Sequence, residues 1–160
     1  MKKTMEMGTS TQNNPYIKLM IMMILSFISM YMLMYAMVNA FENVIPNINQ
    51  FYMAGLMTAP MIIIEIVLMG SMYMNKKLNF IIIAISTVVL IAFFLFIRQQ
   101  AAVSDKQFLR SMIPHHASAI LMCEKTDIQD PEIKDLCKSI ISSQQEEINQ
   151  MKAKLQELEK

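Results

Sequence analysis

Two adjacent residues, His115 and His116, are the only histidines of this 160-residue chain. Met112 lies three residues before the first histidine and Met122 six residues after the second. Thioether sulfur and imidazole nitrogen suit Cu(I), which prefers soft ligands, whereas carboxylate-rich sites suit Mg²⁺, Ca²⁺ or Mn²⁺. These four residues therefore predict a soft-metal site, with Cu(I) as the expected metal and another transition metal as the alternative.

The angular spacing of a helix limits how the two histidines can act. Successive side chains are turned by about 100°, so one ion taking both imidazoles is strained, and one is expected as a ligand and the other as a supporting or intersubunit ligand. The competing interpretation is an ordinary helical core in which the histidines make hydrogen bonds. About a third of the helix circumference holds the following residues: Asp105, Phe108, Met112, His115, His116, Ala119 and Met122.

Glu147 and Met151 are further candidate ligands, on a second helix that follows the first. If the chain turns near residue 128, position 112 lies roughly opposite position 145, and both candidates approach Met112 or its symmetry mate. A solvated charge is the alternative interpretation of Glu147.

Cys123 and Cys137 flank the same turn, at similar distances along the chain. An oxidising exterior compartment permits a bridge between the two helices, although the expected register places position 123 nearer 134 than 137. A disulfide, two free thiols and thiolate metal ligands are the alternatives.

Three long apolar segments precede these candidates, at about residues 17–40, 51–74 and 78–97. About 20 helical residues span the hydrocarbon core of a bilayer, so a region of three transmembrane helices is predicted over residues 17–97. Residues 1–16 are predicted to form a flexible cytoplasmic tail. Lys2, Lys3 and Lys18 before or within the first segment, and Lys76 and Lys77 before the third, place the N-terminus in the cytoplasm. Residues 98–160 are then expected at the periplasmic or extracellular face of a multi-pass protein of the cytoplasmic membrane.

This exterior part carries nine of the 14 basic and ten of the 13 acidic residues. Ser104 followed by Gln107 has the form of a capping box, which predicts a helix over about 104–125. Asp130 as N-cap and Pro131 at the first helical position predict a second helix over about 131–158. Pro114 either kinks the first helix or marks a second start within it.

The predicted fold is therefore all-α: three transmembrane helices followed by an exterior antiparallel hairpin. A hairpin of this size has little core, and a second copy would complete a four-helix bundle. A homodimer or higher homo-oligomer is thus expected.

Two features of the membrane region are unusual. Sixteen of the 19 methionines lie before residue 75; they could pass Cu(I) along thioether stripes, although packing or lipid-facing residues are the more common explanation. Glu65 is a carboxylate predicted near mid-membrane, with no basic residue in these helices to pair with. It is expected to be protonated or to face another subunit.

Several function classes lack their signatures. No His-Glu-x-x-His, Glu-x-x-His, phosphate loop or nucleophile elbow occurs, and there is no basic patch typical of nucleic-acid binding. The chain is therefore not expected to be an enzyme or to bind nucleic acid.

The predicted hairpin carries a long ordered set of residues: Asp105, Phe108, Met112 to His116, Ala119, Ile120, Met122, Asp130 to Ile133, Leu136, Ile140, Ile141, Gln144, Glu147, Ile148 and Met151. Their order and spacing closely resemble the family called domain of unknown function 305. The resemblance covers about residues 104–155 and implies a ferritin-like, mostly periplasmic domain associated with copper binding and resistance. It implies that the metal-site positions are these: Met112, His115, His116, Met122, Glu147 and Met151.

The expected function is sequestration or delivery of Cu(I) by a membrane-anchored exterior hairpin, with the bilayer, a second copy and a copper donor or acceptor protein as partners. A structural or interaction module without metal is the alternative. A metal-dependent enzyme of the ferritin-like kind is a weaker third interpretation.

Overall fold

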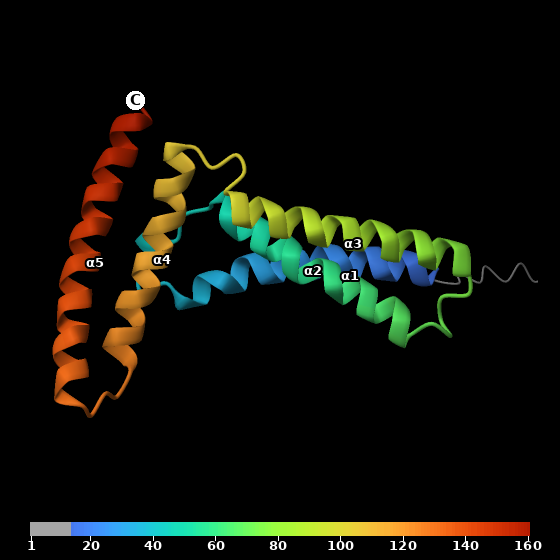
Figure 1. The fold of residues 1–160 in the computed structure, drawn as a ribbon, viewed down its shortest axis with the longest axis horizontal. Coiled ribbons are helices and arrows are strands. Elements are labelled where there is room, and N and C mark those ends of the chain that lie inside the picture. Colours follow the sequence, from blue (N-terminus) through green and yellow to red (C-terminus); the bar gives the residue numbers. More distant parts are fainter. Residues whose placement is uncertain (1–13) are drawn as a thin grey trace, which may run out of the picture.

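The computed structural model describes residues 14–160, and this part of the chain is helical with no strands. Figure 1 shows three roughly parallel helices with a two-helix hairpin across one end. The all-α prediction is confirmed, whereas nearly all of the predicted tail lies outside the described residues. The elements in chain order are α1 (Pro15–Leu33), η1 (Met34–Met37), η2 (Phe41–Asn43), α2 (Ile48–Leu68), α3 (Lys76–Gln99), α4 (Asp105–Lys125) and α5 (Pro131–Leu158).

Three helical segments of the described chain are long and apolar enough to cross a membrane: Pro15–Met37, Ile48–Leu68 and Lys76–Gln99. The first starts two residues earlier than predicted because Asn14 accepts a hydrogen bond from the Tyr16 amide and Pro15 occupies the first turn. It also tightens into the 3₁₀ turn η1 after Leu33. The length and composition of these helices are consistent with a membrane protein.

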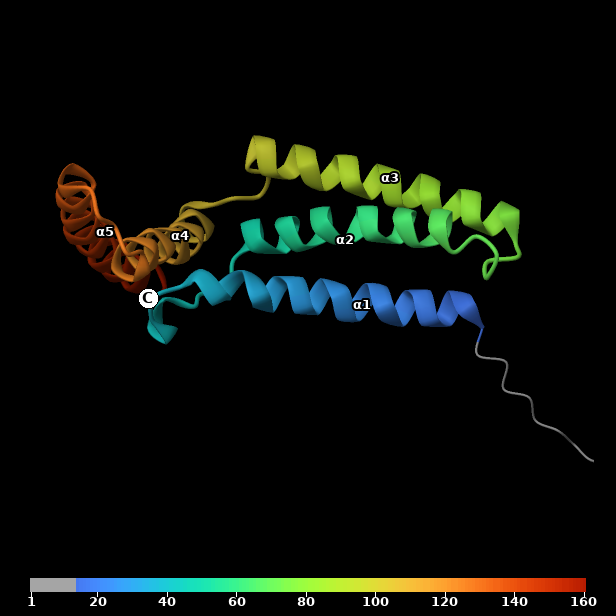
Figure 2. The same cartoon turned by 90° about the horizontal axis from the view of Figure 1, so that it is seen from below.

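Helix α2 lies between α1 and α3 (Figure 2), and its small residues allow the close approach. Ala54, Gly55, Thr58 and Ala59 are buried. The Phe93 ring of α3 fills the space that a side chain at Gly55 would need, because a Cβ there would lie 2.3 Å from a ring carbon. Phe93 also packs edge-on against Phe51 and Phe96. The close contact between α2 and α3 thus depends on glycine, which has no side chain, at position 55.

Gly55→Val is expected to destabilise the membrane helices by about 1–3 kcal/mol, because the added side chain overpacks the contact with Phe93. Thermal unfolding in detergent, followed by circular dichroism, measures this effect. Gly70→Ala is the matched control, since a Cβ at Gly70 meets its nearest atom at 3.5 Å. Equal midpoints for both variants would contradict the packing interpretation.

The hairpin core is built from a different face of α4 than the sequence pattern predicts. Ile113, Ala117 and Ile120 are fully buried against Ile148 and Leu155 of α5. The predicted seam of α4 is instead half-exposed, with Phe108 52 % and Met122 51 % accessible. Two apolar stripes run along α4, and the aliphatic one packs into the core.

The hairpin is docked on its own membrane region through α4, the helix nearer to it (Figures 1 and 2). Val38 and Ile45 of the loop between α1 and α2 pack on the hairpin core. The Lys152 ammonium lies 3.5 Å from the Glu42 carboxylate. The small core is therefore enlarged from within the chain, which removes one reason to invoke a second copy. The dimer stays a prediction.

The capping predictions are confirmed in part. Asp130 accepts from the Ile133 amide at 3.0 Å, as an N-cap does. Ser104 accepts from the Gln107 amide, but the reciprocal half of the box is absent because the Gln107 amide oxygen accepts from the Ile48 amide instead. Helix α4 runs through Pro114 without a break, so the second-start alternative is wrong.

Candidate metal centre

His116 is the buried member of the histidine pair. It is 7 % exposed, and its Nε2 lies 2.7 Å from Oε2 of Glu147 on α5. Its other ring nitrogen, Nδ1, is buried and has no hydrogen-bond partner. A carboxylate on one ring nitrogen fixes the orientation of the imidazole and raises the basicity of the other nitrogen, as it does for metal-ligating histidines. His116 is therefore oriented by Glu147 with a free Nδ1.

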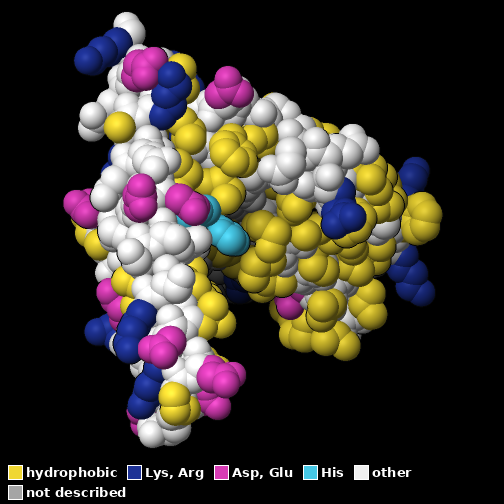
Figure 3. All heavy atoms as spheres, turned by 60° about the vertical axis from the view of Figure 1, so that its left-hand side comes forward, with side chains coloured by type: hydrophobic (Ala, Val, Ile, Leu, Met, Phe, Trp, Pro, Cys, Tyr) yellow, Lys and Arg dark blue, Asp and Glu magenta, His cyan; other side chains and the backbone are white. Residues whose placement is uncertain are grey.

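His115 is exposed and points away from the hairpin core. The two imidazole centroids are 6.0 Å apart, with ring planes at 62°. Figure 3 shows both histidines, in cyan, where the hairpin meets the hydrophobic membrane region. Because α4 stays helical across both residues, the expected divergence of the rings is observed.

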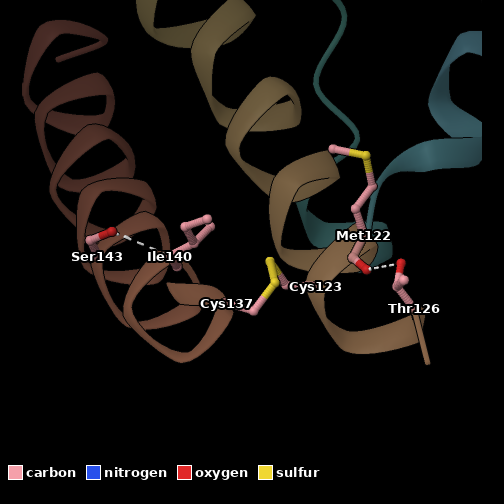
Figure 4. The surroundings of a disulfide bond; sticks show 6 residues. All are labelled: Met122, Cys123, Thr126, Cys137, Ile140 and Ser143. Carbon is pink, nitrogen blue, oxygen red and sulfur yellow. Dashed lines mark hydrogen bonds between the residues drawn. A yellow bond between two sulfur atoms is a disulfide. The ribbon is translucent and has the colours of Figure 1, made fainter. Parts of the chain in front are cut away.

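The candidate methionines occupy three different environments. Met112 is half-buried, Met122 is 51 % exposed, and Met151 packs against the hairpin core. Figure 4 shows Met122 projecting from α4 away from α5. One chain therefore offers thioethers close in sequence to the histidines but does not gather them around one point in the core.

The hairpin register differs from the predicted one. Cys123 lies beside Cys137, His116 beside Glu147, and Arg110 is hydrogen-bonded to Glu159 at 2.6 Å. Helix α5 begins at Pro131, and its first residues extend past the end of α4 before Cys137 meets Cys123. Each residue of α4 therefore lies opposite a residue further along α5 than the predicted register indicated. Glu147 consequently meets His116, and not Met112 as the predicted register indicated.

Cys123 and Cys137 form a disulfide, with their Cα atoms 5.3 Å apart (Figure 4). This is one of the three alternatives that the sequence left open. The bridge joins α4 and α5 near the turn. Neither cysteine is then available as a thiolate ligand.

Sequence reasoning missed the polar residues that hold α4 against the membrane region. The Asn49 amide donates to Ser111 Oγ at 3.2 Å, and Ser111 donates to Asn47 at 3.3 Å. Tyr52 donates to the Ala101 carbonyl at 2.9 Å. Asn47 and Asn49, polar residues at the start of an apolar segment, were the available signal. These contacts hold the middle of α4, which carries the histidine pair, against the end of the membrane region (Figure 1).

Glu65 is not the isolated mid-membrane carboxylate that the sequence suggested. It lies three residues before the end of α2, and the Tyr73 hydroxyl donates to its Oε1 at 3.2 Å. Burial, followed by the hydrogen bond with Glu65, raises the pKa of Tyr73 above its ordinary value. Tyr73 thus keeps its proton at neutral pH and remains a donor.

The donor set of one chain suits a soft metal but is incomplete. Residues 14–160 contain no group of three or more His, Cys, Asp or Glu side chains placed to hold an ion. The free Nδ1 of His116, the exposed imidazole of His115 and nearby thioethers are the groups available. This combination disfavours hard cations, which need several oxygen ligands.

The chain is similar to a known protein family and to a viral protein. The family described as "Domain of unknown function (DUF305)" matches residues 96–155. An uncharacterized protein of Acanthamoeba polyphaga mimivirus is 39 % identical over 148 residues, which cover 91 % of this chain and 94 % of the viral protein. No solved structure matches. The relative is similar far beyond the hairpin, so the chain and the viral protein belong to one family, and residues 96–155 of the chain match the DUF305 domain.

Proposed function

We propose that the protein binds Cu(I) at the exterior face of a membrane and sequesters or delivers it. The observation that carries this proposal is the state of His116: Glu147 holds its Nε2, and its buried Nδ1 has no partner. A buried imidazole nitrogen without a partner is costly unless a ligand occupies it. The adjacent His115 and the thioethers of Met112 and Met122 add soft donors.

The orientation of the chain is part of the proposal. The lysine pattern supports a cytoplasmic N-terminus, and a disulfide between α4 and α5 agrees with an oxidising exterior compartment for the hairpin. With this topology the histidines lie at the outer end of the membrane helices. Copper would be exchanged there with a donor or acceptor protein.

The ligand set also bears on assembly. Because residues 14–160 of one chain bring together no complete set of donors, we propose that a second copy supplies the remaining ligands in a homodimer. Copper analysis of separated monomer and dimer tests this directly: copper held by the dimer alone supports the shared site, whereas a monomer that binds copper as tightly rejects it.

Glu147→Gln tests the role of the carboxylate. The variant is expected to lower the apparent Cu(I) affinity about 10–100-fold, since an amide orients and polarises the imidazole less well than a carboxylate does. Competition with a Cu(I) chelator, using the full chain in detergent, measures the affinity.

Glu146→Gln is the matched control. The Glu146 carboxylate is next to Glu147 in the sequence but is exposed, and in the described chain it accepts a hydrogen bond only from Gln150. The control should bind as the wild type does. If the wild type binds no Cu(I), the proposed function is wrong and a structural module is favoured. In that case Glu147→Gln changes only the stability of the hairpin.

A further inference from the structure

The copper proposal does not explain why large apolar side chains along one line of α4 are exposed. Phe108, His115 and Met122 are spaced by seven residues, so they follow one line along the helix. All three are exposed, although two are large and apolar. We call these three residues the outer stripe of α4.

The outer stripe lies on the side of the hairpin that faces the membrane region. Helix α4 contacts α2, η1 and η2 and lies between them and α5 (Figures 1 and 2). Figure 3 places the histidines at the junction of the hairpin with the apolar membrane helices, and Figure 4 shows Met122 pointing away from α5. The stripe therefore continues the lipid-exposed surface of the three spans.

The distribution of charge along the hairpin agrees with this position. The five charged residues of α4 lie at its two ends and leave Ser111 to Cys123 uncharged, whereas α5, on the far side from the membrane helices, has nine in all. An interfacial helix lies in the headgroup region with its apolar side chains inserted and its polar side toward water. In this hairpin the second helix supplies the charged outer surface.

We propose that α4 lies on the phospholipid bilayer, with Phe108 and Met122 in the boundary between headgroups and acyl chains. The occupant of this face is lipid, because the stripe is continuous with the spans that the bilayer already surrounds. His115, midway along the stripe, then opens toward the headgroup region. The lipid contact does not depend on the copper proposal, since it requires no metal.

The absence of tryptophan from the chain permits a direct test. Phe108→Trp places a single fluorophore on the outer stripe, and Leu136→Trp places one on α5. Leu136 is the matched control because it is 58 % exposed, against 52 % for Phe108, yet belongs to the helix farther from the membrane. The full chain is reconstituted in phosphatidylcholine vesicles, with and without brominated acyl chains.

Brominated lipid is expected to quench the tryptophan at position 108 by about half or more, with a blue-shifted emission, because the ring would lie about 5–10 Å into the headgroup and acyl boundary. The tryptophan at 136 should emit as in water and stay unquenched. Met122→Trp repeats the test at the other end of the stripe if Phe108→Trp does not fold; because Met122 is also a proposed copper donor, this variant is used for lipid contact only.

Two outcomes would overturn the proposal. Water-like, unquenched emission at 108 and 122 shows that the stripe faces solvent. Blue-shifted emission without quenching shows that protein, such as a second copy, covers it. The Cu(I) affinity is measured separately on the wild type, so failure of this inference and failure of the copper proposal are distinguishable.

Discussion

Replacing both histidines with alanine is expected to lower the apparent Cu(I) affinity at least about 100-fold. A group that only supports a ligand contributes about 10–100-fold, so loss of both imidazoles should exceed that range. Chelator competition with the full chain in detergent measures the change, and circular dichroism verifies that the helices remain. An affinity within about threefold of the wild type would exclude the histidines as ligands.

The two single variants separate binding from folding. His115→Ala removes an exposed side chain with no hydrogen bond in the described chain, so it should weaken copper binding without lowering stability. His116→Ala also removes the partner of Glu147. That carboxylate keeps access to water, since its side chain is 52 % exposed, and the cost in stability should be about 1 kcal/mol or less beyond the lost packing. If the histidine pair is purely structural, both variants would bind copper as the wild type does, and only stability would change.

Removal of the Cys123–Cys137 disulfide is expected to have the largest effect on stability. The bridge closes a loop between cysteines 14 residues apart, and loops of this size correspond to about 3 kcal/mol of stabilisation. Reduction, or Cys123→Ser with Cys137→Ser, should therefore lower the unfolding midpoint of the hairpin. Thermal melts with and without reductant measure the shift.

The serine double variant is also the control for this experiment. Its midpoint should match that of the reduced wild type and should not respond to reductant. A wild-type midpoint that reductant leaves unchanged would show that the bridge contributes nothing to stability. The hairpin would then be held by its apolar core, including the contacts with Val38 and Ile45, without help from the bridge.

Much of the fold could be predicted because the signals were local and strong. Apolar runs long enough to cross a bilayer predicted three spans, and Asp130 with Pro131 predicted the start of α5. The buried face of α4 could not be chosen from sequence, since an aliphatic stripe through Ile113, Ala117 and Ile120 competes with a soft stripe through Met122. Only packing against a particular partner decides between two apolar faces.

The candidate site was predicted less completely than the fold. Residue type singled out the histidines and Glu147, but which of them pair depended on the register of the hairpin. The observed register differs from the predicted one by a few residues, so His116, and not Met112, lies opposite Glu147. Glu65 shows the same limit, because its partner Tyr73 reaches it only through the fold of the loop between α2 and α3. Contacts across a turn require its geometry, which the sequence does not specify.

X-ray absorption at the copper edge, on the Cu(I)-loaded full chain, tests the central claim most directly. The proposal predicts imidazole nitrogen together with thioether sulfur in the first coordination shell. The imidazole contribution should disappear in the variant with His115→Ala and His116→Ala. A wild-type spectrum without imidazole scattering, or one identical to that of the variant, would contradict copper binding at this histidine pair.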